Sequence, residues 1–141
     1  MINDGLKLTG KLKIALNGET VQEVDNLVVT AGKGYVASRM KDATATAMSH
    51  MAIGSGSTAA AASDTALGNQ LGRVALTSTA VSNAVVTYTA TFGAGTGTGA
   101  VTEAGILNAS SGGTMLCRTV FSVVNKGASD SMTITWTVTV S

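Results

Sequence analysis

The residues of this chain that can do chemistry are few and lie far apart. The sequence has one histidine, one cysteine and eight acidic residues among 141 positions. A protein metal site usually needs three or four ligands, and His50 has no cysteine or second histidine near it. We therefore interpret His50 as a surface or strand-edge residue and predict no metal ligands.

Cys117 is the single cysteine of the chain and so the only candidate for a catalytic thiol. A catalytic cysteine needs a general base and an accessible, electropositive setting. Cys117 lies instead within the mostly apolar stretch TMLCRTVFSVV at 114–124. Because a free cysteine packs like a small hydrophobic residue, we predict a buried thiol, and a single cysteine excludes a disulfide within the chain.

A glycine-rich loop and two acids complete the candidates. GAGTGTG at 93–99 has neither the GxGxxG spacing nor the GK[ST] ending of phosphate-binding loops, so we interpret it as a flexible hairpin tip. Glu103 and Asp64 have no second acid near them in sequence. We expect each to be solvated or hydrogen-bonded, and only a fold could pair them. With so few acid–base groups, we predict no catalytic residues, no cofactor and no enzymatic activity.

Composition points toward protein contacts. Charged residues make up 12% of the chain, about half of the ~25% usual in globular proteins. The net charge of +1 gives no electrostatic basis for binding nucleic acid or an anionic membrane. No apolar stretch approaches the ~20 residues that span a bilayer, and no secretory signal is predicted. Such a weakly charged surface suits a protein that packs against copies of itself or a partner.

Period-2 alternation of apolar and polar residues predicts strands, most clearly at the two ends of the chain. Residues 6–16 alternate, Asn17-Gly18 predicts a type I′ turn, and 19–24 is expected to return as a strand. In the last strand, 131–140, the alternation places five apolar residues on a buried face and four threonines on a solvated or partner-facing one. These are Met132, Ile134, Trp136, Val138 and Val140, and Thr133, Thr135, Thr137 and Thr139.

The remaining segments complete an all-β protein. A short helix is expected over 30–42, with Thr30 as its N-cap and two early glycines that weaken it. The other strands are expected at 48–54, 71–79, 84–92, 100–107 and 114–124. We predict one domain over 1–141, an antiparallel β-sandwich, jelly-roll-like, with about eight strands.

Two parts of the sequence also resemble small virion proteins of tailed bacteriophages. The first is MSHMAIGSGSTAAAASDTALGNQLGRVAL at 48–76, in which an apolar strand ends in a Gly-x-Gly turn before a small-residue loop, Asp-Thr-Ala-Leu and Arg-Val. These positions are Ile53, Gly54, Gly56, Asp64, Thr65, Ala66, Leu67, Arg73 and Val74. The second part has TEAGI at 102–106 and TITWTVTV at 133–140. The resemblance covers about residues 25–141, and its motifs carry no chemistry.

The resemblance implies a non-enzymatic virion component, either a capsid cement (decoration) protein or a tail-associated or fibre-tip protein. We favour cement, because the chain has no long shaft or coiled-coil segment. The expected location is the capsid exterior after assembly in the host cytoplasm, and the expected partners are the major capsid protein and further copies of the chain, as a dimer or trimer. Lys7, Lys11 and Lys13 share one face; they suit edge protection and are our candidate capsid-docking residues.

A carbohydrate-binding β-sandwich is an alternative of another class. Such a module usually exposes aromatic side chains on which sugar rings stack. Only 4% of this chain is aromatic, and we expect most of these side chains to lie in the core. They are Tyr35, Tyr88, Phe92, Phe121 and Trp136.

Overall fold

The computed structural model describes residues 6–41 and 45–141, which form nine strands and one helix. The all-β class and the single helix predicted from the sequence are confirmed. In chain order the elements are β1 (Leu8–Leu16), β2 (Glu19–Val28), α1 (Thr30–Lys41), β3 (His50–Gly54), β4 (Gln70–Ala75), β5 (Ser78–Ser82), β6 (Val85–Phe92), β7 (Gly99–Leu107), β8 (Met115–Lys126) and β9 (Met132–Val140).

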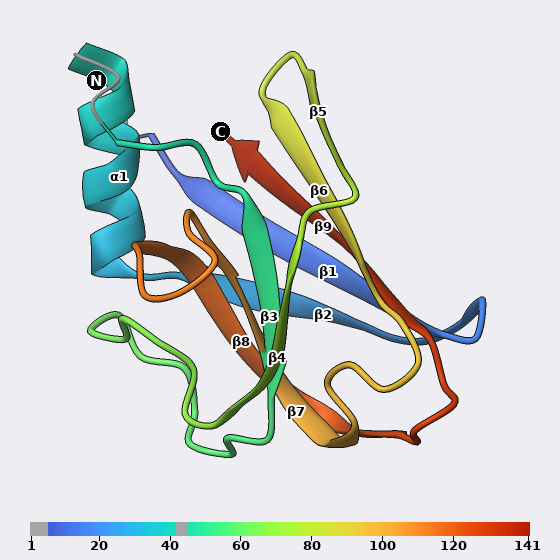
Figure 1. The fold of residues 1–141 in the computed structure, drawn as a ribbon. Helices are drawn as coiled ribbons and strands as arrows, with labels where there is room; N and C mark the ends of the chain where they lie inside the picture. The colour runs from blue at the N-terminus through green and yellow to red at the C-terminus, as the bar shows by residue number, and fades with distance from the viewer. Residues whose placement is uncertain (1–5, 42–44) are drawn as a thin grey trace.

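All strands belong to one antiparallel sheet with the order β4-β3-β7-β8-β2-β1-β9-β6-β5. The sheet curls so that its two halves face each other (Figure 1). Strand β2 joins the halves, because residues 19–26 pair with β1 whereas Leu27 and Val28 pair with β8. The result is two sandwich-like layers made from a single sheet.

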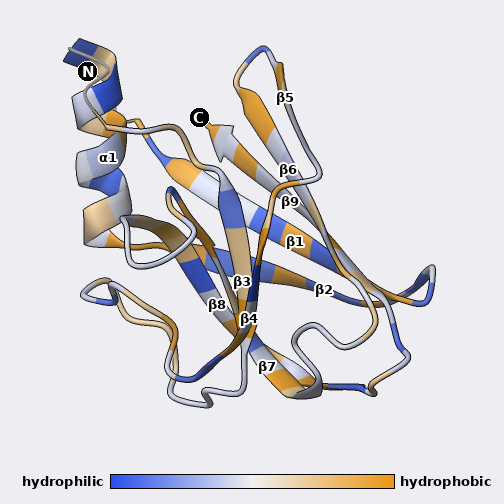
Figure 2. Ribbon diagram, in the orientation of Figure 1, coloured by the Kyte–Doolittle hydropathy of each residue, from blue (hydrophilic) through white to orange (hydrophobic). Residues whose placement is uncertain are grey.

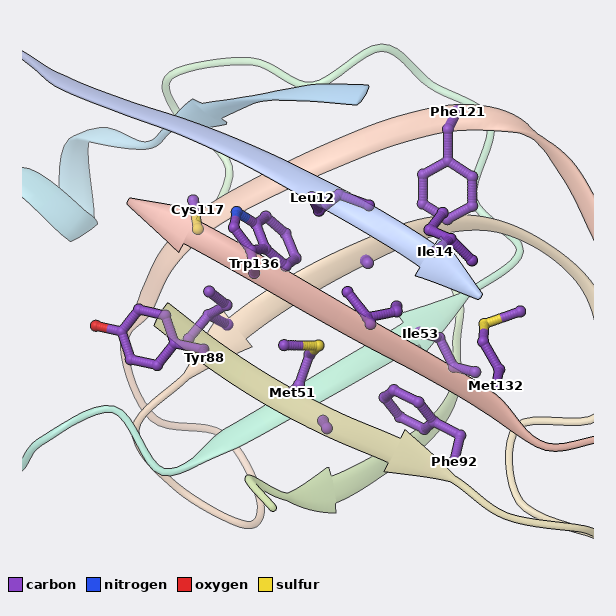
Figure 3. Close-up of a cluster of buried hydrophobic side chains, with 14 of the residues drawn as sticks. Leu12, Ile14, Met51, Ile53, Tyr88, Phe92, Cys117, Phe121, Met132 and Trp136 are labelled. Atoms are coloured by element: carbon purple, nitrogen blue, oxygen red, sulfur yellow. The ribbon is translucent and has the colours of Figure 1, made fainter. Parts of the chain in front are cut away.

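The core fills the space between the two halves. Figure 2 shows the alternation of hydrophobic and more polar residues along β1 and β9 that produces it. Met132, Ile134, Trp136 and Val138 are buried, whereas the threonines between them are partly exposed, as predicted. Val140, the last residue of the predicted buried face, is only half-buried. Trp136 lies opposite Leu12 of β1 and Tyr88 of β6, at the centre of the cluster in Figure 3.

The first hairpin has the predicted turn. Asn17 and Gly18 have φ values of 50° and 84°, the positive values that a type I′ turn requires at both central positions. Strand β2 continues to Val28, four residues beyond the expected end at 24. Its last two residues are the ones that pair with β8, so the longer strand is what links the halves.

The predicted strand at 71–79 was wrong in one respect, since the chain breaks there into β4 and β5. All five residues of β5 are exposed. A strand with no buried face has no alternation of apolar and polar residues. The sequence pattern therefore did not distinguish β5 from the strand before it. The described residues therefore form nine strands where about eight were expected.

Helix α1 begins at Thr30, the first residue of the predicted range, and position 42, its expected end, lies outside the described residues. The predicted N-cap was wrong by one position, because the carbonyl oxygen of Val29 accepts the first intrahelical hydrogen bond, from the N–H of Lys33. Gly32 is the buried residue of this helix. A Cβ added to Gly32 would lie 2.1 Å from the carbonyl oxygen of Leu116, closer than atoms can pack. The glycine that lowers helix propensity is therefore what allows α1 to lie against β8.

Candidate functional site

A buried ion pair lies in the β3–β7–β8 half of the sheet. Glu103 on β7 is 0% exposed and Arg118 on β8 is 2% exposed. The Nε and Nη2 atoms of Arg118 donate hydrogen bonds of 3.1 and 2.9 Å to Oε1 of Glu103. Buried charges are costly unless they are paired and hydrogen-bonded, so the remaining contacts of this pair decide what it does.

The loop at 55–69, here called the cover loop, supplies most of those contacts. Backbone N–H groups of Gly56, Gly68 and Asn69 each donate a hydrogen bond of 2.7 Å to the carboxylate of Glu103. A Cβ on Gly56 would lie 2.4 Å from Oε2 of Glu103, so this close approach requires glycine. The loop backbone thus wraps around one buried carboxylate.

Asp64 of the cover loop binds the other side of Arg118. Nη1 of Arg118 donates to Oδ2 of Asp64 at 2.8 Å, and Nη2 donates to the carbonyl oxygen of Thr58 at 3.1 Å. The N–H of Ala61 also donates to Oδ2 of Asp64, at 2.8 Å. We call Asp64, Glu103 and Arg118 the ionic clamp. The structure thus brings together two acids that the sequence left apart.

The hydrogen bonds hold both carboxylates of the clamp in their charged form. Burial by itself would raise the pKa of Glu103, but donors from Asn69, Gly68, Arg118 and Gly56 outweigh it and lower that pKa below its ordinary value. The pKa of Asp64 is also lowered, chiefly by the Ala61 N–H and further by Arg118. A general acid or base works best with a pKa near the operating pH, and these shifts lead away from it. The clamp is therefore suited to holding structure.

The clamp positions the cover loop against a second, small hydrophobic cluster. Val29, Ala52, Leu107 and Met115 are buried there, and Leu67 of the cover loop packs against them. The N–H of Thr30 also donates a 2.8 Å hydrogen bond to the carbonyl oxygen of Ala62, which connects the loop to the start of α1. The predicted long surface loop is thus irregular in structure but anchored along its length.

The other candidates from the sequence are not members of the clamp. His50 is the half-buried first residue of β3, and its Nδ1 lies 2.8 Å from Oγ of Ser49. Cys117 is fully buried, and burial raises the pKa of its thiol well above the ordinary value; the prediction of a packed thiol is confirmed. The 93–99 loop is attached to β8 through Lys126, whose buried Nζ donates to the carbonyl oxygen of Gly93 at 2.8 Å.

The three lysines proposed for docking are exposed, but acids lie beside two of them. Lys11 is opposite Asp25 of β2, and Lys13 is opposite Glu23. Opposite charges directly across two strands attract each other. Lys7 lies before the part of β1 that pairs with β2. The sequence did not indicate this balance, because it depends on the register between the two strands.

Four of the five aromatic side chains are buried, as expected. Trp136 and Phe92 are 0% exposed, and Tyr88 and Phe121 are 8% exposed. Tyr35 of α1 is half-buried. The described part of the chain therefore presents no aromatic platform of the kind on which sugar rings stack.

The opposite half of the sheet carries a neutral outer face. Thr87, Thr89 and Thr91 of β6 lie directly opposite threonines of β9. The hydroxyl oxygens of Thr91 and Thr133 are 3.0 Å apart. We call this surface the threonine face; it consists of Thr87, Thr89, Thr91, Thr133, Thr135, Thr137 and Thr139.

An apolar groove opens on the inner side of the same half, between α1 and strands β5, β6 and β9. Its volume is about 460 Å³. Most of its lining side chains are apolar, and Met40 and Val81 in its wall are 76% and 73% exposed. The charged lining residue is Arg39. This groove has the character of a contact surface and lacks the convergent polar groups of a small-molecule site.

Comparison of the chain with protein-family models, curated proteins and solved structures found no match. Among the described residues, no three His, Cys, Asp or Glu side chains lie together in a way that could hold a metal ion. The helix in this part of the chain is too short and polar to cross a membrane.

Proposed function

We propose that this protein is a non-enzymatic structural component of a bacteriophage particle, and specifically a capsid cement (decoration) protein that bridges major capsid proteins. One observation carries the proposal: the charged side chains of the interior are hydrogen-bonded within the chain, while the threonine face on β6 and β9 carries no charge. Glu103, Arg118 and Lys126 are the buried charged side chains among the described residues, and all are hydrogen-bonded within the chain. What remains at the surface suits contact with other proteins.

The positions that carry the resemblance to small virion proteins support the proposal. Gly56 and Asp64 from the first motif and Glu103 from the second meet in and around the ionic clamp. Arg73 of the first motif donates to the carbonyl oxygens of Ala109 and Gly112 and so holds a second loop. The motif positions therefore hold two loops in place, which agrees with the structural role that the resemblance implies.

Cementing needs contact area and no chemistry. A protein that adds a modest interface to each of many capsid subunits strengthens the whole shell, because the linked contacts act together. The threonine face can approach another protein without burying charge, which avoids the cost of charge desolvation. The exposed Lys7, Lys11 and Lys13 flank this face and are the proposed points of attraction to an acidic capsid surface, with Lys7 the least balanced by acids on β2.

The test compares virions made with and without the coding sequence of this chain. Cement function predicts that particles lacking it assemble and adsorb normally but release DNA at a lower temperature or under milder osmotic shock. Adding the purified protein back should restore stability, and a variant with Lys7, Lys11 and Lys13 all changed to Glu should restore it less well. Robust particles that fail to adsorb would contradict cementing and favour the tail-associated or fibre-tip alternative.

A further inference from the structure

The two edges of the sheet are protected to different extents. Edge strands usually carry charge, proline, a bulge or a covering loop, because a bare edge invites pairing with another strand. Strand β4 carries Arg73, which binds the backbone of the 108–113 loop, and its pairing with β3 is irregular near Gly54. This edge has the usual protection.

Strand β5 at the other edge has none of these features. It pairs with β6 on one side, and no described strand pairs with its other side. All five of its residues are exposed. Residues 74–102, which include β5 and β6, contain no charged residue, histidine or proline. Its backbone N–H and C=O groups on the free side are thus open to another strand.

The apolar groove adjoins this bare edge. Thr79 and Val81 of β5 line it, together with Val86 and Tyr88 directly opposite them on β6. Val81 is 73% exposed, which is unusual for an apolar side chain on the inner side of a sheet. The free edge and the unfilled groove therefore form one continuous surface.

We propose that two copies of this chain pair through β5, antiparallel and about a two-fold axis at Ala80. In this register Ala80 meets Ala80, and Thr79 of each copy lies opposite Val81 of the other on the groove side. The two half-sheets become continuous, and the two apolar grooves adjoin each other.

A second copy fits this surface for two reasons. Antiparallel pairing of a strand with itself satisfies the free backbone groups of both copies at once. Because residues 74–102 carry no charge, the two β5–β6 edges meet without like-charge repulsion; Arg39, the charged residue of the groove lining, lies on α1. The inference deepens the proposed function, which has copies of the chain meeting on a particle, but its test uses the isolated protein and so can fail or succeed separately.

Disulfide trapping tests the register. Directly opposed residues have Cβ atoms ~4.5–5.5 Å apart, close to the separation that a disulfide needs. Cys117 is fully buried, so an added cysteine is the accessible thiol. Ala80→Cys should form a cross-linked dimer readily under mild oxidation. Ser82→Cys, whose opposite residue would be Ser78, is the matched control and should cross-link poorly.

Sedimentation velocity over a range of concentrations tests the interface. The wild type should sediment as a dimer at micromolar concentration, and Val81→Lys should sediment as a monomer with an unchanged thermal midpoint. Val123→Lys places the same change on β8, at a valine that is 52% exposed, and should remain dimeric.

Three results would overturn the inference: a wild type that is monomeric at every concentration, a Val81→Lys variant that dimerises as the wild type does, or equal cross-linking of Ala80→Cys and Ser82→Cys. Should Val81→Lys fail to fold, the two cysteine variants decide the question, since each replaces a small exposed residue. A confirmed dimer with virions unaffected by loss of the protein would refute the cement function and leave the dimer standing.

Discussion

The two halves of the sheet differ in whether a loop covers the outer face. In the β4–β3–β7–β8 half, the cover loop lies over the sheet and the ionic clamp holds it there by hydrogen bonds to Glu103 and Arg118. In the β1–β9–β6–β5 half, the threonine face has no such cover among the described residues, and β5 ends the sheet with a bare edge. We call these the covered half and the open half.

Polar groups therefore have a different role in each half: in one they bind each other inside the protein, and in the other they form a neutral surface. The covered half contains buried charges and closely packed glycines. The polar groups of these residues form hydrogen bonds with one another within the chain. The open half combines a well-packed inner face around Trp136 with a neutral outer face and an unfilled groove. The surface that we propose for association therefore lies on strands β5, β6 and β9, which contain no charged residue.

The largest expected effect lies in the shared core. Trp136→Ala should lower the free energy of unfolding by ~3–5 kcal/mol, as a large-to-small change at a fully buried site does. Trp136 is 0% exposed and lies between Leu12 and Tyr88 on neighbouring strands. Urea denaturation followed by far-UV circular dichroism measures the loss. A loss below ~1 kcal/mol would show that the open half is loosely packed on its inner side as well.

The next effect tests the clamp. Glu103→Gln should cost about 3 kcal/mol, because it breaks the buried ion pair, leaves Arg118 with Asp64 as its one remaining carboxylate partner, and sets the amide NH₂ of glutamine against backbone donors. Glu19→Gln, at an exposed position of β2, is the control and should change stability by less than ~0.5 kcal/mol. Similar urea midpoints for the two variants would mean that the clamp does not hold the covered half together.

Acid should weaken the covered half through the same residues. The pKa values of Glu103 and Asp64 are lowered in the folded chain. Their contribution to stability is therefore present above the ordinary carboxyl pKa values of about 4 and is lost as the pH falls through the lowered folded values. Wild-type stability should decline with acid more steeply than that of Glu103→Gln, when urea midpoints are compared across the acidic range. Parallel declines would contradict this assignment.

The smallest effect is expected on the threonine face. Thr135→Ala should cost less than ~1 kcal/mol, because Thr135 is partly exposed and lies outside the core. The stability loss of Thr135→Ala is compared with that of Trp136→Ala, the next residue on the same strand. If the two alanine variants lost equal stability in urea, the assignment of inner and outer faces to β9 would be wrong.

The parts of the fold that alternation governs could be predicted from the sequence. The buried face of β9, the Asn17-Gly18 turn and the packed thiol of Cys117 each follow from local pattern or from residue type. Strand β5 could not be predicted in this way, because a strand with five exposed residues has no apolar period.

The ionic clamp could not be predicted because its members come from three distant segments. Its acids are 39 positions apart in the chain, at 64 and 103, and meet through Arg118. One signal was present: Arg118 and Glu103 each stand within a mostly apolar predicted strand. Charged residues are almost never fully buried unless they are paired, so two such residues of opposite sign on neighbouring strands indicate a buried pair.

Hydrogen exchange on the free protein and on purified virions tests the central claim most directly, since it reports which half is covered in the assembly. Amides on the free edge of β5 should exchange rapidly in a dilute, monomeric sample and slowly on the particle, while those bound to Glu103 in the cover loop should be protected equally in both. Particles that lack this chain, or particles on which β5 exchanges as fast as in the dilute monomer, would contradict the account.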